Sequence, residues 1–440
     1  MTNDPRSLLD QAPMHRFQIF AVFMCILLNA LDGFDVLAIS FASPGIASEW
    51  NIDRAALGIV LAMELIGMAI GSITLGNLAD RLGRRPTILG CLVLMTVGMT
   101  ASAFADSLNH LLIYRFLTGL GVGGMLASTN ALVAEFANAK YRNLAVILMA
   151  TGYPIGAIVG GSVATVLLDH YSWHAIFVFG GAVTGFFLLV SWFYLPESVN
   201  FLVAKQPPMA LQKINQNLAK MGHPPIQQLP EKSSTHNASS FKMLMTGQYR
   251  SITLLLVAAY FTHIMTFYYI LKWIPKIVVD MGFEPSSAGS VLVWANVGGA
   301  IGALLLGLFA SRFKLRPLLI GILVLSFAMV TVFGLGPQSL FNLSLVSAAT
   351  GFFTNAGVVG LYALMAQAFP AEVRGSGTGL VIGIGRGGAA LGPVIAGYLF
   401  VAGFDLLDVS IAMGLGALVS AAALMYLGKV MRARQLDGQV

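Results

Sequence analysis

Long apolar runs recur along the whole chain and alternate with short polar segments. Twelve of these runs reach the length of about 20 residues that a helix needs to cross a bilayer. Because lipid offers no partner to exposed backbone groups, each run is expected to be a helix. The pattern predicts an all-α membrane protein with spans at residues 17–41, 54–76, 86–104, 109–134, 143–168, 173–195, 251–275, 286–309, 315–335, 339–368, 375–401 and 405–428.

One long polar stretch separates the first six runs from the last six. It extends from Pro196 to Arg250 and is rich in proline and polar residues. Such a composition predicts a linker, and one short surface helix is expected around Met209–Met221. We therefore divide the chain into an N-terminal six-helix bundle (1–195), a cytoplasmic linker (196–250) and a C-terminal six-helix bundle (251–440).

Composition and charge agree with a membrane location. Hydrophobic residues make up 57% of the chain and charged residues 10%, whereas a soluble domain carries about 25% charged residues. If both termini are cytoplasmic, all but five of the 25 Lys and Arg residues fall on the cytoplasmic side, and this bias sets orientation. The five exceptions are Arg54, Arg115, Lys272, Lys276 and Arg386. The net charge of +6 therefore indicates topology and contact with lipid headgroups, not nucleic-acid binding.

The chain carries no pattern typical of catalysis or metal binding. Cys25 and Cys91 both lie inside apolar runs and have no metal-site spacing. His170 and His174 are one helical turn apart, but no third ligand accompanies them. We expect no metal, no cofactor and no enzymatic activity, and we expect the protein to work as a monomer.

A loop sequence is repeated in the two halves. Residues 76–86 read GNLADRLGRRP after the second run, and residues 307–317 read GLFASRFKLRP after the eighth. Arg142 before the fifth run is likewise matched by Arg374 before the eleventh. Two six-helix halves related by an axis along the membrane normal are typical of transporters that bind substrate near the midplane.

Several motifs resemble those of a known family. The segment Gly76–Arg85 resembles the G-x-L-a-D-r-x-G-R-R loop signature of the major facilitator superfamily, and Arg115 with its following glycines resembles that superfamily's helix-4 motif. Within the superfamily, Asp32-Gly33-Phe34-Asp35 resembles the D-G-x-D signature of the aromatic acid:proton symporters. The segments Leu195–Leu202, Trp273–Pro275 and Gly383–Arg386 also fit that family.

The resemblance implies a fold and an activity. It implies two pseudo-symmetric six-helix bundles that import a small, hydroxybenzoate-like aromatic carboxylate together with a proton, by alternating access, across a bacterial inner membrane. A sugar or polyol symporter, an aliphatic diacid symporter and an efflux antiporter of the same superfamily remain alternatives. One position departs from the pattern: Ser311 stands where the first loop copy has Asp80, so the second loop is not expected to form the same latch.

Charges inside the spans are the candidates for function. A charged side chain at the bilayer centre costs roughly 2.5–3.5 kcal/mol on insertion scales, so it is seldom kept without a role. The main candidates are Asp32, Asp35, Glu64, Arg115 and Arg386, with His263 and Lys272 as lesser ones. A coupling proton needs a carboxylate that titrates near neutral pH, and burial promotes this. We assign the proton to Asp32 or Asp35, with Glu64 as an accessory acid.

An aromatic carboxylate also needs a cation and an apolar wall. Guanidinium matches a carboxylate with two parallel hydrogen bonds, and we place Arg386 first and Arg115 second in this role. Arg115 could instead be a structural partner of Asp32 or Glu64. Ring walls and amides that could bind ring hydroxyls are provided by Asn29, Phe34, Tyr260, Phe267, Trp294 and Asn355, although core packing or lipid contact is the alternative for each ring.

A second set of charges lies at the cytoplasmic edge of the spans. The superfamily resemblance implies that this set forms a gate between helices that closes the cytoplasmic side. The predicted gate residues are Asp80, Arg81, Arg84, Arg85, Glu135, Arg142 and Arg374.

Overall fold

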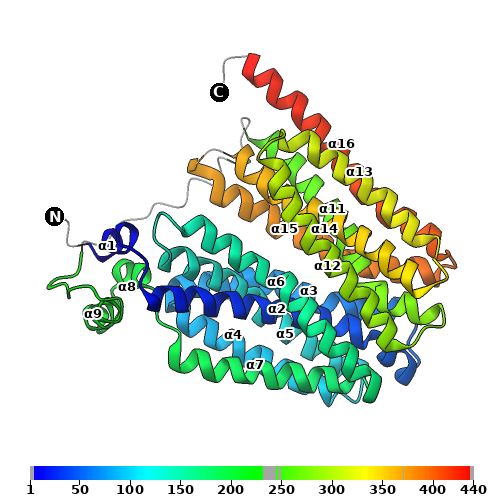
Figure 1. Ribbon diagram of the computed structural model, residues 1–440, viewed down its shortest axis with the longest axis horizontal. Helices are drawn as coiled ribbons and strands as arrows, with labels where there is room; N and C mark the ends of the chain where they lie inside the picture. Colours follow the sequence, from blue (N-terminus) through cyan, green and yellow to red (C-terminus); the bar gives the residue numbers. More distant parts are fainter. Residues whose placement is uncertain (1–3, 231–243, 246–248, 370, 437–440) are drawn as a thin grey trace. The chain divides into compact units, whose positions relative to one another are not determined.

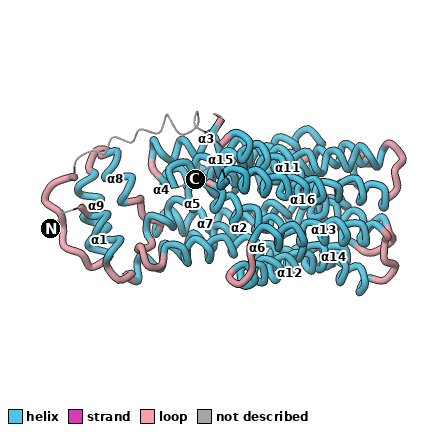
Figure 2. The backbone as a smooth tube through the Cα atoms, turned by 90° about the horizontal axis from the view of Figure 1, so that it is seen from above, coloured by secondary structure: helices cyan, strands magenta, loops and turns pink. Residues whose placement is uncertain are grey.

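The computed structural model describes residues 4–230, 244–245, 249–369 and 371–436. Helices dominate this part of the chain, and Figure 2 shows no strand in it. Twelve of the described helices are long and apolar enough to cross a membrane, which confirms the predicted all-α membrane fold.

The long helices follow the predicted order. The first six are α2 (Arg16–Trp50), α3 (Arg54–Leu82), α4 (Arg84–Ala103), α5 (Leu108–Phe136), α6 (Arg142–His170) and α7 (His174–Tyr194). The last six are α11 (Arg250–Asp280), α12 (Pro285–Ala310), α13 (Leu315–Gly334), α14 (Leu340–Ala368), α15 (Ala371–Val401) and α16 (Leu406–Leu436). Within the described residues, three short helices accompany them: α1 (Pro5–Gln11), α8 (Val199–Lys205) and α9 (Ala210–Lys220).

Helix starts are set by short polar side chains that cap free backbone N–H groups. The Ser107 hydroxyl accepts a bond from the N–H of His110 at the start of α5, and Ser339 does the same for Asn342 at the start of α14. Asp53 caps α3 in the same way through the N–H of Ala56, at 2.7 Å. The fourth and tenth spans therefore begin with the same device.

Several helices extend beyond their predicted ends, and two of them, α2 and α11, continue past a proline. The prediction ended the first span at residue 41, yet α2 continues through Pro44 to Trp50. Proline supplies no N–H to the carbonyl one turn earlier, but the Ser43 hydroxyl donates to the Ser40 carbonyl at 2.8 Å. The local side chain replaces the missing bond, and the helix continues. Helix α11 likewise continues past Pro275 to Asp280.

The described chain forms two compact units. One consists of Met1–Val36, Gly67–Val159 and Phe177–Thr235, and the other of Leu37–Ile66, Gly160–Ile176 and His236–Val440. These boundaries follow packing rather than the sequence repeat, because they cut through α2, α3 and α6. In the second unit α11 is central and packs against α12, α14, α15 and α16.

Glycines allow matching helix pairs to approach closely in the two halves. Gly67 and Gly71 of α3 lie directly against backbone carbonyls of α5, and Gly298 and Gly302 of α12 lie against carbonyls of α14. A side chain at any of these positions would collide with backbone atoms. Small residues that bring helices together are common in membrane proteins. The second-to-fourth and eighth-to-tenth spans thus repeat one packing arrangement.

The linker forms more helix than predicted. Helix α9 falls within the range expected for the single surface helix, but α8 was not predicted. It forms because the Ser198 hydroxyl accepts the N–H of Phe201 at 3.1 Å and because Phe201 and Leu202 are buried. Helix α8 packs against α1 and α9, and Figures 1 and 2 both show these three short helices gathered at one end of their unit.

The packing of α6 on α2 gives a first prediction. A side-chain carbon at Gly156 would overlap the carbonyl of Ala30, so Gly156→Ala is expected to lower the unfolding free energy by about 1–3 kcal/mol. Gly90→Ala is the matched control because nothing lies near that position on α4. There the better helix propensity of alanine should leave stability unchanged or raise it by up to about 1 kcal/mol. Thermal unfolding in detergent measures both, and equal effects would contradict the packing argument.

Candidate functional site

The two acids of the D-G-x-D segment lie in the interior of the first unit. Asp32 and Asp35 of α2 are buried, at 1% and 0% exposure. Between them, Gly33 lies so close to the Tyr153 carbonyl of α6 that no other residue fits without a shift. Glycine is therefore required here for a steric reason, because it allows α6 to pack against the helix turn that carries both acids.

Arg115 holds α5 against that same turn. Its side chain is completely buried, and its Nη2 donates to the backbone carbonyl of Asp35 at 3.0 Å. The guanidinium also lies 5.2 Å from the ring centre of Phe177, a distance typical of cation–π contact. These contacts give Arg115 a structural role. A structural role was the alternative to substrate binding in the sequence analysis.

A buried ion pair lies in the second unit. Glu64 of α3 and Lys272 of α11 are both completely buried, and the carboxylate oxygen is 4.0 Å from the Nζ atom. The two residues are far apart in sequence, and only the fold brings them together. Lys272 was a minor candidate from the sequence and was not among the predicted binding residues.

Arg386 lies in the second unit on α15, which packs along α11. Its side chain is half-buried. The preceding Gly385 lies directly against the ring of Tyr260, whose hydroxyl shares a 2.9 Å hydrogen bond with that of Tyr362. Tyr362 was missed by sequence reasoning because an isolated tyrosine in an apolar helix carries no signal.

The remaining predicted binding residues have varied surroundings. The amide of Asn29 donates to the Met149 carbonyl at 2.6 Å, and that of Asn355 donates to the Gly299 carbonyl at 2.9 Å. Part of the bonding capacity of both amides is thus used between helices. The rings of Phe34 and Phe267 are buried against Phe179 and Tyr268, whereas Trp294 is 52% exposed.

The predicted cytoplasmic gate divides into two groups in the structure. In the first group, Arg84 bonds to Asp80 at 2.6 Å and to Glu135 at 3.2 Å, so it joins α3, α4 and α5. Arg85 donates to the Trp192 carbonyl at the end of α7. Arg81 is exposed.

Arg142 belongs to the second group. It donates to the Ala134 carbonyl near the end of α5 and pairs with Asp10 of α1. This pairing attaches the N-terminal helix to the segment between α5 and α6, where the Ala139 N–H also donates to the Asp10 carbonyl. Asp10 was not predicted, because it lies outside every motif. Arg374 falls in the first turns of α15, and its side chain is outside the described part of the chain.

Glu197 connects the loop signature to the segment after α7. Its carboxylate accepts the backbone N–H groups of Arg84 at 2.9 Å, Arg85 at 3.3 Å and Ser198 at 2.8 Å, so it caps the start of α4. Gly83 has a φ of +112° and no room for a side chain beside this carboxylate. Burial raises the pKa of Glu197, and the three N–H groups and the Arg84 charge offset only part of that rise.

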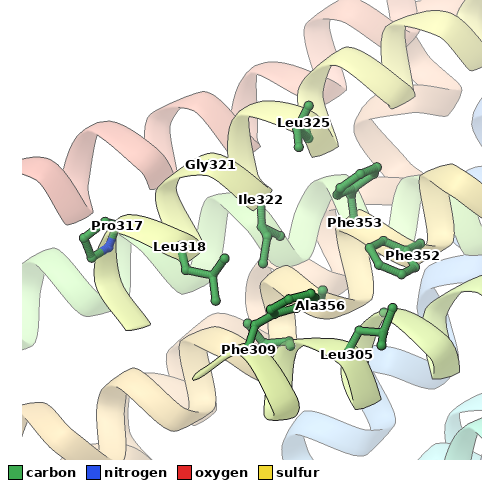
Figure 3. A pocket seen from close by; sticks show the side chains of 12 residues that line it. Leu305, Phe309, Pro317, Leu318, Gly321, Ile322, Leu325, Phe352, Phe353 and Ala356 are labelled. Carbon is green, nitrogen blue, oxygen red and sulfur yellow. The ribbon is translucent and has the colours of Figure 1, made fainter. Parts of the chain in front are cut away.

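A pocket of about 400 Å³ lies between α12, α13 and α14. Figure 3 shows its lining, which includes Leu305, Phe309, Ile322, Phe352 and Phe353. All the lining residues are apolar. An anion placed there would be desolvated without a partner, which is unfavourable. This pocket therefore does not suit a carboxylate.

Comparison with known proteins identifies the family of this chain. Residues 23–293 and 256–436 match the Major Facilitator Superfamily. The chain belongs to this superfamily of transporters. The 4-hydroxybenzoate transporter of Pseudomonas putida is 31% identical, covering 98% of this chain and 95% of the relative. The gallate transporter of the same species is also 31% identical, covering 96% and 94%.

The fold is shared with a solved sugar transporter. The D-xylose–proton symporter superposes with a TM-score of 0.71 at 18% identity, covering 93% of this chain and 97% of that one. The resemblance based on the loop signature and the D-G-x-D segment is confirmed, as is the fold of two six-helix bundles. The protein is a multi-pass membrane transporter and not an enzyme.

The cap on α4 gives a second prediction. Glu197→Ala removes the acceptor and should lower the unfolding free energy by about 1 kcal/mol, whereas Glu197→Gln keeps an oxygen for the N–H groups. The raised pKa means that the stabilisation linked to protonated Glu197 is present at low pH and is lost as pH rises through the folded-state value.

Wild type should therefore lose stability relative to Glu197→Gln as pH rises from about 4 to about 8. Thermal unfolding of the purified proteins across that range measures the difference. Glu284→Gln is the control, because Glu284 is exposed and its side chain caps nothing. A constant difference between wild type and Glu197→Gln would contradict the assigned pKa direction.

Proposed function

We propose that this transporter imports a small, hydroxybenzoate-like aromatic carboxylate together with a proton across the bacterial inner membrane by alternating access. The observation that carries this proposal is the identity of about 31% over nearly the whole chain to transporters of 4-hydroxybenzoate and gallate. The burial of three carboxylates in the spans, Asp32, Asp35 and Glu64, supports the proton. In this proposal both termini are cytoplasmic, as the distribution of Lys and Arg favours.

The coupling proton is assigned to the Asp32 and Asp35 pair. Two carboxylates three residues apart lie on neighbouring positions of one helix, and both are withdrawn from solvent. Desolvation and a like charge both favour the protonated form of a carboxylate. A proton taken from the outer side can therefore be held here while the protein changes conformation.

Arg386 is assigned to the substrate carboxylate. It is only half-buried, so it can be reached without breaking the core. Its neighbour Tyr260 supplies a ring and, with Tyr362, a pair of hydroxyls that can bond a phenol. Arg115 fits a substrate role less well, because it is completely buried and bonds the Asp35 backbone. We propose that it positions the acid-bearing turn.

The cytoplasmic cluster around Arg84 is assigned to conformational control. Its ion pairs join the ends of α3, α4 and α5. These residues lie at helix ends, where charges are less costly than at the bilayer centre. We propose that making and breaking such contacts gates the inner side.

Uptake into proteoliposomes tests the transport proposal. An imposed inward proton gradient should drive accumulation of 4-hydroxybenzoate above its equilibrium level. Asp32→Asn keeps the size of the side chain but holds no titrating proton, so it should lower gradient-driven uptake at least about 10-fold, the size of a lost 1.4 kcal/mol. Exchange of substrate at equal concentrations on both sides should continue at a measurable rate, because exchange needs no net proton movement.

Wild-type uptake that does not respond to the gradient would overturn symport. Transport of hexoses, or of a diacid such as muconate, in place of hydroxybenzoate would favour the alternative substrate classes. Concentrative uptake that survives intact in Asp32→Asn would reject the assignment of the proton to that residue.

Arg386 gives a separate prediction about recognition. Arg386→Gln should weaken binding of 4-hydroxybenzoate about 10- to 100-fold, since a charge-assisted bond contributes about 1.5–3 kcal/mol. Binding of the uncharged methyl ester should change little, because the ester never had an ion pair to lose. Binding assays on purified protein compare the two ligands. Equal losses for both would indicate a structural role for Arg386.

A further inference from the structure

Within the second unit, the first turns of α3 contact α11 and α15 at two levels. At the helix start, Arg54 bonds to Asp280 of α11 at 2.9 Å, and its guanidinium lies 4.9 Å from the Phe400 ring centre on α15. Ten residues further along α3, Glu64 meets Lys272, eight residues before Asp280 on α11. We call this contact between α3 and α11 the α3–α11 seam.

The two ion pairs of the seam differ in surroundings. The Arg54 and Asp280 side chains are 42% and 26% exposed, so water screens them, and such pairs contribute little. Glu64 and Lys272 are both completely buried. Removing the charge of one partner there would leave the other charge desolvated, which is strongly unfavourable. A change in the charge of one partner therefore affects the stability of the seam mainly at the buried Glu64–Lys272 pair.

The cost of an unbalanced charge in the buried pair links proton uptake to substrate binding. If Glu64 takes up a proton, the buried pair is left with one net positive charge, which a second anion close by would balance. A substrate carboxylate has the charge and size to take that place. The exchange balances: Lys⁺ with Glu⁻, plus a proton and a carboxylate anion, becomes Lys⁺ with carboxylate, plus neutral Glu–H. The site has the same net charge before and after.

We propose that Lys272 is a binding site for the substrate carboxylate, and that Glu64 is its counter-ion in the empty state and accepts a proton of its own when the substrate binds, in addition to the coupling proton held by Asp32 or Asp35. This inference rests on the proposed symport of an aromatic carboxylate and adds a site to it. On this assignment the seam separates when both proton and substrate are present, because either one alone changes the net charge of the buried pair.

Lys272 and Arg386 are distinct positions. Arg386 lies beside the level of Tyr260, and Lys272 follows Tyr260 by twelve residues, or about 18 Å of helix. The carboxylate of a single-ring acid can meet only one of these cations at a time. Lys272 is thus the contact for the carboxylate at the seam, and Arg386, on α15 beside α11, is a second and separate contact for it.

Other titratable groups on neighbouring spans have to be separated from Glu64 in any test. In the second unit they include His263, Tyr268, Tyr269 and Asp280 on α11 itself, Tyr362 on α14 and Arg386 on α15. The test therefore removes the pair itself and leaves these groups in place.

The experiment counts protons taken up on binding. Purified full-length protein is titrated calorimetrically with 4-hydroxybenzoate or its methyl ester, in two buffers that differ in ionisation enthalpy. Wild type should take up about one proton with the acid and about none with the ester. The double variant Glu64→Gln/Lys272→Gln removes both charges together, so it leaves no lone buried charge.

The double variant should bind the acid at least about 10-fold more weakly, or about 1.4 kcal/mol, and without proton uptake. Its binding of the ester should be unchanged. Lys272→Arg keeps the cation and should retain the proton uptake. Lys276→Gln is the control on the same helix, one turn away in the exposed pair with Asp280, and should behave as wild type. If the amide pair does not fold, Glu64→Gln/Lys272→Met provides a second neutral pair for the same measurement.

Unchanged acid affinity and proton uptake in the double variant would overturn this inference, and so would equal weakening of acid and ester. Both results would leave the symport proposal intact, with the proton on Asp32 or Asp35. A wild-type protein that binds neither ligand would instead reject the proposed substrate class. The two failures are therefore distinguishable.

Discussion

A buried polar group in this protein needs a partner inside the protein, because the long helices offer it neither water nor exposed backbone. This constraint explains features at several scales. The hydroxyl of Ser43 bonds the carbonyl that Pro44 leaves unsatisfied, and α2 continues as a helix. Arg115 donates to a backbone carbonyl of the turn that carries the buried acids. Glu64 and Lys272 neutralise each other at the centre of the α3–α11 seam.

Close packing and charge act together at the same positions. Gly33 brings α6 against the turn with Asp32 and Asp35, and Gly83 leaves room for the Glu197 carboxylate at the start of α4. In both places a glycine lets backbone or carboxylate atoms approach where a side chain would prevent it. These two glycines of the chain therefore have a steric role beside the charged residues next to them.

The second unit contains the initial part of α3 together with α11 and α15, so the compact units do not follow the sequence repeat. Two ion pairs join α3 to α11 in this unit, the exposed Arg54–Asp280 pair and the buried Glu64–Lys272 pair. A proton or an anion changes the energy of the deep pair far more than that of the exposed pair, because screening is weak in the interior. This difference makes the buried pair suited to couple binding to a change of conformation.

The sequence by itself determined the twelve spans and the repeated loop, because spans depend on local hydrophobicity and the motifs are contiguous. It also identified Asp32, Asp35, Glu64, Arg115 and Arg386 as unusual, since a charge in an apolar run is visible without a structure. It could not pair them. Only the tertiary structure joined Glu64 to Lys272, Arg142 to Asp10 and Arg84 to Glu197, because these partners are distant in sequence and belong to no common motif. Local pattern sets the helices, whereas the partner of a buried charge is decided by which helices pack together.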